Sequence, residues 1–401
     1  MRWLGRLSLA ILFWCFFSAV LPAPVAFGKG KKLVDEMHPR APDSPLKIEF
    51  EDFYCATCLE EGRIEVAGTQ KITMMRKDAL DLAVKLGVGK KKDLGKKFFL
   101  IHAGHTKIFS NLVRAKVKPN DSAFITFDMQ RMKKIFPKLK LGLQGTVLTP
   151  HQRAHLYHIR LCRVYSHFKA LTNCDKDFLG NEAPFEVFLF DDYAEHHRLN
   201  DRYTGRTNDK AGMRHHDRDT PNFHVFTTAD SLVAGNDAKF FNHVVHNYVH
   251  NLVDGFWNYY RETPAWLEEG IAHYYERRES PKHNTFCWAE GKAPTAFQKP
   301  DWSATLLGMV RRGKDVPLGG WCEKLLPGEL GGAEQGLSWG IVEWMIQTDP
   351  IRFTMVLELT QDRKGKPTAA EVIMKAFGAS PNVIHTRWRE FAKKEYPRRK
   401  N

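Results

Sequence analysis

The sequence predicts an α+β fold that is mainly helical and contains a small mixed sheet. Residues 149–170 have the start signal and the apolar spacing of a long helix. Two short apolar runs, FEVFLFDD (185–192) and NFHVFTT (222–228), have the composition of strands. The last third of the chain repeats apolar residues at helical spacing. With 401 residues and 43% hydrophobic content, such a chain can bury a sizeable core.

Residues 1–28 have the layout of a secretory signal peptide. Two arginines precede an apolar run from Leu7 to about Val20, and small residues and prolines follow this run. The alternative is a retained anchor helix, because the run approaches the ~18 to 20 residues that span a bilayer. We therefore expect a secreted, periplasmic or cell-envelope protein with no stable membrane span after signal cleavage.

The rest of the chain divides by composition into four parts. Residues 29–46 are polar, charged and proline-bearing, which is typical of a linker. Residues 47–148 are expected to form a small N-terminal α/β region with strands at LKIEF and KFFLIHAG. Residues 149–280 form the predicted core. Residues 281–401 form a predicted C-terminal helical subdomain that packs on this core.

Two helices of the core carry a start signal in the sequence. Thr149 and Thr263 are each followed by proline, and this pair is typical of a capping residue and the first helical position. The first of these helices is expected at 149–170, and the second in TPAWLEEGIAHYYERR.

The chain is basic, with a net charge of +14. A basic exported protein can bind anionic envelope components, although net charge does not define a fold. The densest basic run lies within residues 88–97 and has neither the spacing of a phosphate-binding loop nor interleaved aromatic residues. We therefore expect a solvated basic face there and no nucleic-acid partner.

Six cysteines follow the signal segment, and an even number in an oxidising compartment predicts disulfides whose pairing stays open. Cys55 and Cys58 are separated by two residues. No βαβ pattern accompanies them, as a thioredoxin-type redox motif would require, and no second Cys-x-x-Cys completes a zinc ribbon. A local structural disulfide is the preferred interpretation, and a redox role is the alternative.

The stretch 239–256 predicts a mostly buried helix with one polar stripe. Residues three and four apart share a helix face, so the stripe contains His243, His246, Asn247, His250 and Asp254. Because the other faces are apolar, this stripe needs polar partners or a cleft. Two imidazoles at i and i+4 can both bind one zinc ion, at ~2.0 to 2.1 Å.

Three other histidine pairs are predicted to be solvated. The pair His151 and His155 has the same spacing, but no acidic residue follows it at a matching distance, so we expect a solvated helix face. Two further histidine pairs lie between the two predicted strands and lack helical spacing or nearby cysteines and glutamates. They are predicted to be loop residues: His196, His197, His215 and His216.

Eighteen residues separate His250 from Glu269, which lies in PAWLEEGIAHYYE. This combination resembles the gluzincin metallopeptidases, whose HExxH helix is followed after about eighteen residues by a glutamate and a glycine. The resemblance covers about residues 183–395 and is strongest at 240–280. It implies a zincin-like core of the peptidase MA-like type, with His246, His250 and Glu269 as zinc ligands. It also implies that NFHVFTT is the edge strand for an extended peptide and FEVFLFDD an inner strand.

Asn247 departs from the gluzincin pattern. The family has a glutamate at this position, which takes a proton from the zinc-bound water. An amide can orient a water but cannot accept its proton, and general acid-base assistance is worth ~10²- to 10⁴-fold in rate. We therefore expect zinc binding with lost or strongly reduced peptide hydrolysis.

Three neighbouring residues are candidates for supporting roles. Glu268 could serve as a substitute base, although adjacent helical residues diverge by about 100°, so that Glu268 and Glu269 cannot both face the metal squarely. Asp254 could hydrogen bond to His250, and His273, four residues after Glu269, could orient that carboxylate or, less favourably, bind the metal.

Three functions remain compatible with the sequence. The first is an exported zinc-binding, peptidase-like protein that binds a peptide, a protein or an envelope component with little or no turnover. The second is an active zinc metallopeptidase that uses a substitute base. The third is an envelope protein without a metal, in which the helix pair is only a core and the basic surface binds an anionic polymer.

Overall fold

The computed structural model describes residues 54–55, 99–103, 105–117, 125–130, 147–180, 184–204, 212–217, 220–229, 233–258, 263–291, 294–361 and 365–398. The predicted signal peptide, the predicted linker and the predicted strand LKIEF lie outside these residues. Within them, no helix is long and apolar enough to cross a membrane.

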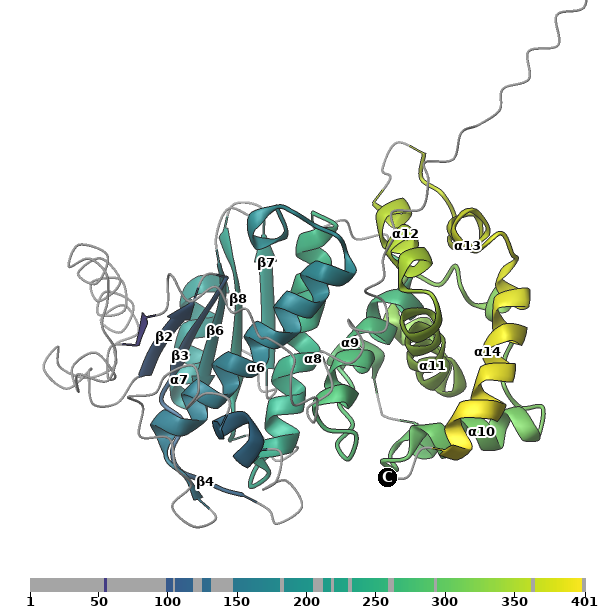
Figure 1. Ribbon diagram of the computed structural model, residues 1–401. Coiled ribbons are helices and arrows are strands. Elements are labelled where there is room, and N and C mark those ends of the chain that lie inside the picture. Colours follow the sequence, from purple (N-terminus) through teal and green to yellow (C-terminus); the bar gives the residue numbers. More distant parts are fainter. Residues whose placement is uncertain are drawn as a thin grey trace, which may run out of the picture.

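A six-stranded mixed sheet forms one half of the fold, in the order β1-β2-β3-β6-β8-β7 (Figure 1). Strands β3, β6 and β8 are parallel, and the outer pairs are antiparallel. The bounds are β1 (Tyr54–Cys55), β2 (Phe99–Ala103), β3 (Thr106–Ser110), β6 (Phe185–Phe190), β7 (Gly212–Asp217) and β8 (Thr220–Thr227).

FEVFLFDD is an inner strand, as predicted, because β6 lies between β3 and β8. Its side chains are almost all buried, as expected for a central parallel strand covered on both faces. NFHVFTT is not the edge strand, because β7 pairs with β8 on its outer side. The prediction missed β7 because its sequence, GMRHHD, does not alternate apolar and polar residues.

The histidines between these strands are not loop residues. His215 and His216 belong to β7. His196 and His197 belong to helix α7 (Tyr193–Thr204), where His196 is fully buried. The solvated-loop prediction was wrong, since a short polar helix and a polar edge strand both resemble a loop in composition.

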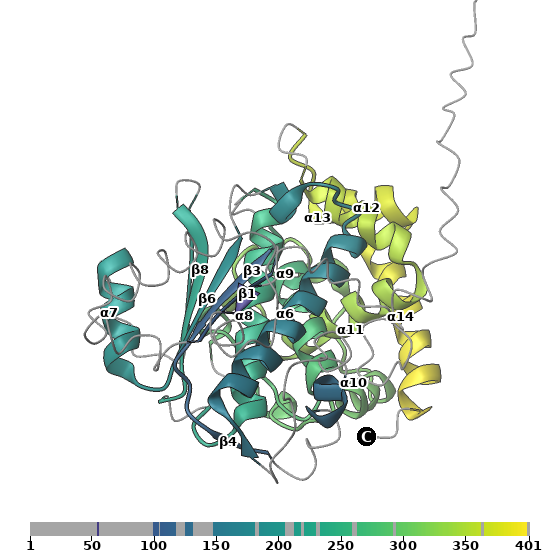
Figure 2. The same ribbon diagram turned by 60° about the vertical axis from the view of Figure 1, so that its left-hand side comes forward.

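Helices cover both faces of the sheet. In Figure 2, α7 lies on one side, and α6 (Pro150–Leu171) and α8 (Asp237–Phe256) lie on the other. Helix α6 starts as the sequence predicts: the Thr149 side chain accepts from the backbone of Gln152, whose side chain accepts from the Thr149 backbone. Helix α8 contains the predicted polar stripe, and Asn236 caps it.

The described C-terminal part is helical, and its helix Gly332–Thr348 packs against helix α9 (Ala265–Glu279), which follows α8 in the chain. One hydrophobic core runs from Cys55 to Tyr396. Helix α9 begins one residue later than predicted, and its N-cap is Pro264, without a capping side chain from Thr263. The other helices are α10 (Trp302–Arg311), which the sequence reading missed, α11 (Gly332–Thr348), α12 (Pro350–Thr360), α13 (Ala369–Phe377) and α14 (Pro381–Glu395).

The region before residue 148 does not stand apart from the core. Strands β2 and β3 pair with each other, and β3 pairs with β6 in the same sheet. A small second sheet joins β4 (Ala115–Lys116) to β5 (Val147–Leu148). The sheet therefore crosses the boundary that composition suggested at residue 148.

A glycine lets α9 (Ala265–Glu279) approach α11 closely. A Cβ atom on Gly270 would lie 2.7 Å from both the Ser338 carbonyl oxygen and Val342 Cγ2. Real Cβ atoms do not come so close, so any larger residue would push the two helices apart. Glu269 precedes this contact, and its position therefore depends on it.

We expect Gly270→Ala to lower the free energy of unfolding by about 1 to 3 kcal/mol through overpacking. Gly308→Ala in α10 is a matched control, because its Cβ would meet only the flexible Arg312 guanidinium, at 3.3 Å. That change should raise stability by about 0.5 to 1 kcal/mol through helix propensity. Urea unfolding of both variants checks the signs, and a destabilisation equal in both would contradict the close-packing argument.

Candidate metal centre

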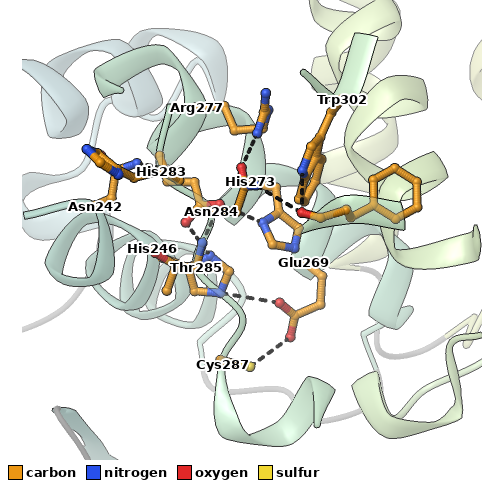
Figure 3. Close-up of polar contacts among 12 residues, drawn as sticks. Asn242, His246, Glu269, His273, Arg277, His283, Asn284, Thr285, Cys287 and Trp302 are labelled. Carbon is orange, nitrogen blue, oxygen red and sulfur yellow. Dashed lines mark hydrogen bonds and ion pairs between the residues drawn. The ribbon is translucent and has the colours of Figure 1, made fainter. Parts of the chain in front are cut away.

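The two histidines of the HxxxH pair and Glu269 converge between α8 and α9. His246 and His250 contribute Nε2 atoms that lie 3.1 Å apart. Glu269 Oε2 lies 3.5 Å from His246 Nε2 and 3.3 Å from His250 Nε2. Their exposed fractions are 0%, 1% and 1%, so the cluster is closed to solvent. Figure 3 shows the contact of His246 with Glu269 and the contact of Glu269 with Cys287.

These separations fit a single ion. With bond lengths of ~2.0 to 2.1 Å, tetrahedral angles put neighbouring nitrogen and oxygen ligands about 3.3 Å apart. The three distances of 3.1, 3.3 and 3.5 Å scatter around that value. Glu269 Oε2 has no hydrogen bond of good geometry from the described residues although it is buried, and a cation between the three atoms would satisfy it.

A carboxylate lies behind each imidazole. Glu268 Oε1 is hydrogen bonded to His250 Nδ1 at 2.7 Å, whereas Glu276 Oε2 lies 3.3 Å from His246 Nδ1 as an ion-pair contact without good hydrogen-bond geometry. A carboxylate at Nδ1 favours the tautomer with a proton there and leaves the Nε2 lone pair free. Two lone pairs and a carboxylate then face one point, which is an arrangement that repels itself without a cation.

The pKa shifts of His246 and Glu269 also indicate that this buried cluster needs positive charge. Burial lowers the pKa of His246, but the adjacent Glu269 and Glu276 carboxylates outweigh burial and raise this pKa to about 9. Burial raises the pKa of Glu269, yet the His250 charge and the contacts with both imidazoles bring it well below its usual range. Without a metal, protons on the histidines supply the positive charge.

Cys287 is a fourth candidate ligand that was not predicted from the sequence. Its Sγ lies 3.5 Å from Glu269 Oε1, and one ligating atom from each of His246, His250, Glu269 and Cys287 lies within 4.8 Å of the others. The cysteine comes from the loop after α9, eighteen residues beyond Glu269. The role of Cys287 as a candidate ligand could not be predicted from the sequence, because no periodicity or motif connects this loop to the helices.

Backbone hydrogen bonds fix the Cys287 loop over the site. The Cys287 amide donates to Glu290 Oε2 at 2.8 Å, and the Thr285 amide donates to Glu276 Oε1 at 3.3 Å. Burial, followed by the Glu269 and Glu290 charges, raises the pKa of the Cys287 thiol well above its ordinary value. The thiol is therefore neutral in the metal-free site, and a bound cation would be needed to hold it as thiolate.

Asn247 does not stand in for a general base. Its Nδ2 donates to the His243 carbonyl, one turn back in α8, at 2.9 Å. The amide is thus tied to the backbone of its own helix.

Glu268 occupies a different place from that of a substitute base. Its carboxylate is on the Nδ1 side of His250, across the ring from the converging Nε2 atoms. Arg214 of β7 lies 3.4 Å from Glu268 and 3.5 Å from Asp254, so both carboxylates share this guanidinium. The geometry makes Glu268 a positioning partner of His250, and it puts Asp254 beside Arg214.

His273 is held by two other carboxylates. Its Nδ1 lies 2.9 Å from Glu276, and its Nε2 lies 2.9 Å from Glu290. Both ring nitrogens therefore face carboxylates other than Glu269, and His273 lies outside the cluster of His246, His250, Glu269 and Cys287. It belongs instead to two neighbouring groups that could hold a metal ion, one with His246 and Glu276 and one with Glu269 and Glu290. Through Glu276, His273 instead supports the carboxylate behind His246. Glu276 lies seven residues after Glu269 on the same face of α9, and this helical spacing could have revealed it.

The predicted disulfides are not found among the described cysteines. No disulfide joins any two of the described cysteines, which are Cys55, Cys162, Cys174, Cys287 and Cys322. Cys58 lies outside the described residues, so the local Cys55–Cys58 bridge stays a prediction. Cys162 packs inside α6 beside His158, and Cys287 lies at the candidate metal centre.

The second HxxxH pair is not a solvated face either. His155 is 1% exposed, and its Nε2 lies 3.0 Å from His151 Nε2. Cys55 Sγ lies 3.3 Å from the same His151 nitrogen. The prediction failed because the partner of this pair, strand β1, lies 96 residues earlier in the chain.

Comparison of the sequence with models of known protein families and with curated protein sequences finds no match.

Proposed function

We propose that this protein is a zincin-like, gluzincin-type zinc-binding protein that does not hydrolyse peptides. His246, His250, Glu269 and Cys287 hold one Zn²⁺ in a site without an open position. The observation that carries the proposal is the convergence of four ligating atoms, two of them imidazole nitrogens whose rings each have a carboxylate near Nδ1. Thiolate, imidazole and carboxylate together are the ligands that zinc prefers.

The arrangement around the site supports the zincin-like assignment. A helix with HxxxH lies against a helix that contributes a glutamate, and both lie beside a mixed sheet whose outer strand β7 is antiparallel. The resemblance to gluzincins implies this combination. Gly212 of β7 comes within 2.8 Å of His243 Nε2 when a Cβ is added, so the edge strand lies directly on α8.

Two features remove hydrolysis together. Zinc in an open three-ligand site polarises a carbonyl and lowers the pKa of a bound water to ~7. Cys287 takes the position that this water needs, and Asn247 has no basicity with which to remove the proton. Because Glu268 is committed to His250 and Arg214, it is not available as the substitute base that the active-peptidase alternative requires.

The remaining role that fits is binding. Within the described residues β7 pairs on one side only, and an unpaired strand edge can add an extended peptide through main-chain hydrogen bonds. The resemblance implies that NFHVFTT is the edge strand that binds an extended peptide. Because β7 lies outside β8 in the sheet, we infer that β7 has this role instead. The net charge of +14 favours acidic peptides or anionic envelope components as ligands. Zinc would then hold α8 and α9 in place behind that edge.

We expect His246→Ala, His250→Ala and Cys287→Ala each to lower zinc affinity, with the two histidine changes removing one full equivalent. Metal analysis of protein purified without chelator, with competition by a chromophoric chelator, measures this. His385→Ala is the control, because His385 pairs with Asp315 elsewhere in the C-terminal half. Unchanged zinc content in both histidine variants would refute the site.

We expect Asn247→Glu alone to create no peptidase activity, because Cys287 still fills the fourth position. The double variant Asn247→Glu/Cys287→Ala restores both a base and an open position, so we expect zinc-dependent cleavage of unfolded casein that exceeds the wild type by at least ~10²-fold. Zinc-dependent cleavage by the wild type would contradict the closed site. Cys287→Ala alone is the control that separates the two effects.

We expect zinc binding to release protons and to weaken as pH falls. The metal needs neutral imidazoles and a thiolate, whereas the metal-free site keeps His246 protonated up to a pKa of about 9. Affinity should therefore rise with pH as His246 loses its proton, and should go on rising above that pKa because the pKa of the Cys287 thiol is raised well above its ordinary value. Calorimetry in buffers of different ionisation enthalpy counts the released protons, and a pH-independent affinity between pH 6 and 9 would oppose a site built from these ligands.

A further inference from the structure

We propose that Cys55, His151 and His155 form a second zinc site, separate from the first in residues and in position along the chain. These three residues come from strand β1 and from the first two turns of α6. Their ligating atoms lie within 4.8 Å of one another. The proposal does not depend on the function proposed above.

The distances match the edges of a tetrahedral site. With ~2.3 Å for sulfur and ~2.0 to 2.1 Å for nitrogen, neighbouring ligands should lie about 3.3 Å apart for two nitrogens and about 3.6 Å apart for sulfur and nitrogen. His151 Nε2 and His155 Nε2 are 3.0 Å apart, and Cys55 Sγ is 3.3 Å from His151 Nε2. Each separation is within a few tenths of an ångström of the expected edge.

The surroundings hold these side chains in that position. Cys55 and His155 are almost completely buried, at 0% and 1% exposed. Phe99 of β2 stacks on the His151 ring, with ring centroids 5.0 Å apart, and so fixes its orientation. His151 is itself only partly buried, so solvent can reach the cluster and complete a four-coordinate ion.

Hydrogen bonds among the same three residues would hold β1 to α6 only weakly. A thiol is a poor donor and acceptor, and only one of two facing imidazole nitrogens can donate to the other. Within the described residues, strand β1 consists of Tyr54 and Cys55 and pairs with β2. A metal bond from Cys55 to α6 would anchor this strand at the edge of the sheet, which is a structural role for the ion.

The donor set selects the ion. One thiolate and two imidazoles suit zinc and exclude calcium and magnesium, which prefer oxygen ligands. On binding, Cys55 loses its thiol proton to solvent and the two imidazoles bind as neutral ligands through Nε2. No acidic residue belongs to this cluster among the described residues, in contrast to the centre between α8 and α9.

The test uses the full chain under a non-thiol reductant, with His246→Ala/His250→Ala to empty the first site. We expect this variant to keep one equivalent of zinc. After replacement by Co²⁺, it should show a thiolate-to-metal charge-transfer band. Adding Cys55→Ser or His155→Gln should remove both the bound equivalent and the band. His158→Gln is the matched control, a buried histidine of the same helix outside the cluster, and it should keep both.

Where the double-histidine variant does not fold, as judged by circular dichroism, the wild-type background gives the same answer. There the zinc content should fall from two equivalents to one with Cys55→Ser. Three results would overturn the proposal. They are a folded double-histidine variant that holds no zinc, a zinc content that Cys55→Ser does not lower in either background, and an intact mass that shows Cys55 oxidised with Cys58 in protein purified without reductant.

Discussion

The structure around the candidate centre depends on one electrostatic constraint: three electron-rich atoms face one buried point. His246 Nε2, His250 Nε2 and Glu269 Oε2 lie 3.1 to 3.5 Å apart at sites without solvent. At effective dielectric constants near 20, unit charges 4 Å apart interact by about 4 kcal/mol, so such a group cannot be left without positive charge. Protons or a metal ion must supply it.

Much of the neighbouring packing serves to keep these atoms in place. Gly270 lets α9 approach α11 closely, and the position of the neighbouring residue Glu269 depends on this contact. The Glu268 and Glu276 carboxylates lie behind the imidazole rings of His250 and His246. Arg214 and His273 in turn hold those carboxylates, so that each buried charge has a partner. The network is continuous from β7 through α8 and α9 to the loop at Cys287.

Sequence predicted those parts of this arrangement that repeat along one element. The α6 cap, the buried strand β6 and the polar stripe of α8 are local patterns, and the spacing from His250 to Glu269 links two helices that follow each other directly. Other parts depend on chain segments that meet only in three dimensions. Cys287 belongs to a loop without periodicity, the edge strand β7 is too polar to be recognised, and Cys55 reaches His151 across 96 residues.

Asn247 at the base position and Cys287 at the metal centre together account for the proposed loss of hydrolysis better than either residue does alone. A zinc site that lost only its glutamate would keep an exchangeable water and, with it, slow and unselective hydrolysis. In the proposed site a thiolate in the fourth position would exclude this water, and the bound ion would stabilise the fold instead of a transition state. The same logic applies to β1 and α6, where thiolate and imidazoles meet without a carboxylate. The chain thus combines cysteine with an HxxxH pair twice, and in both places the cysteine comes from a segment outside the helix that carries the histidines.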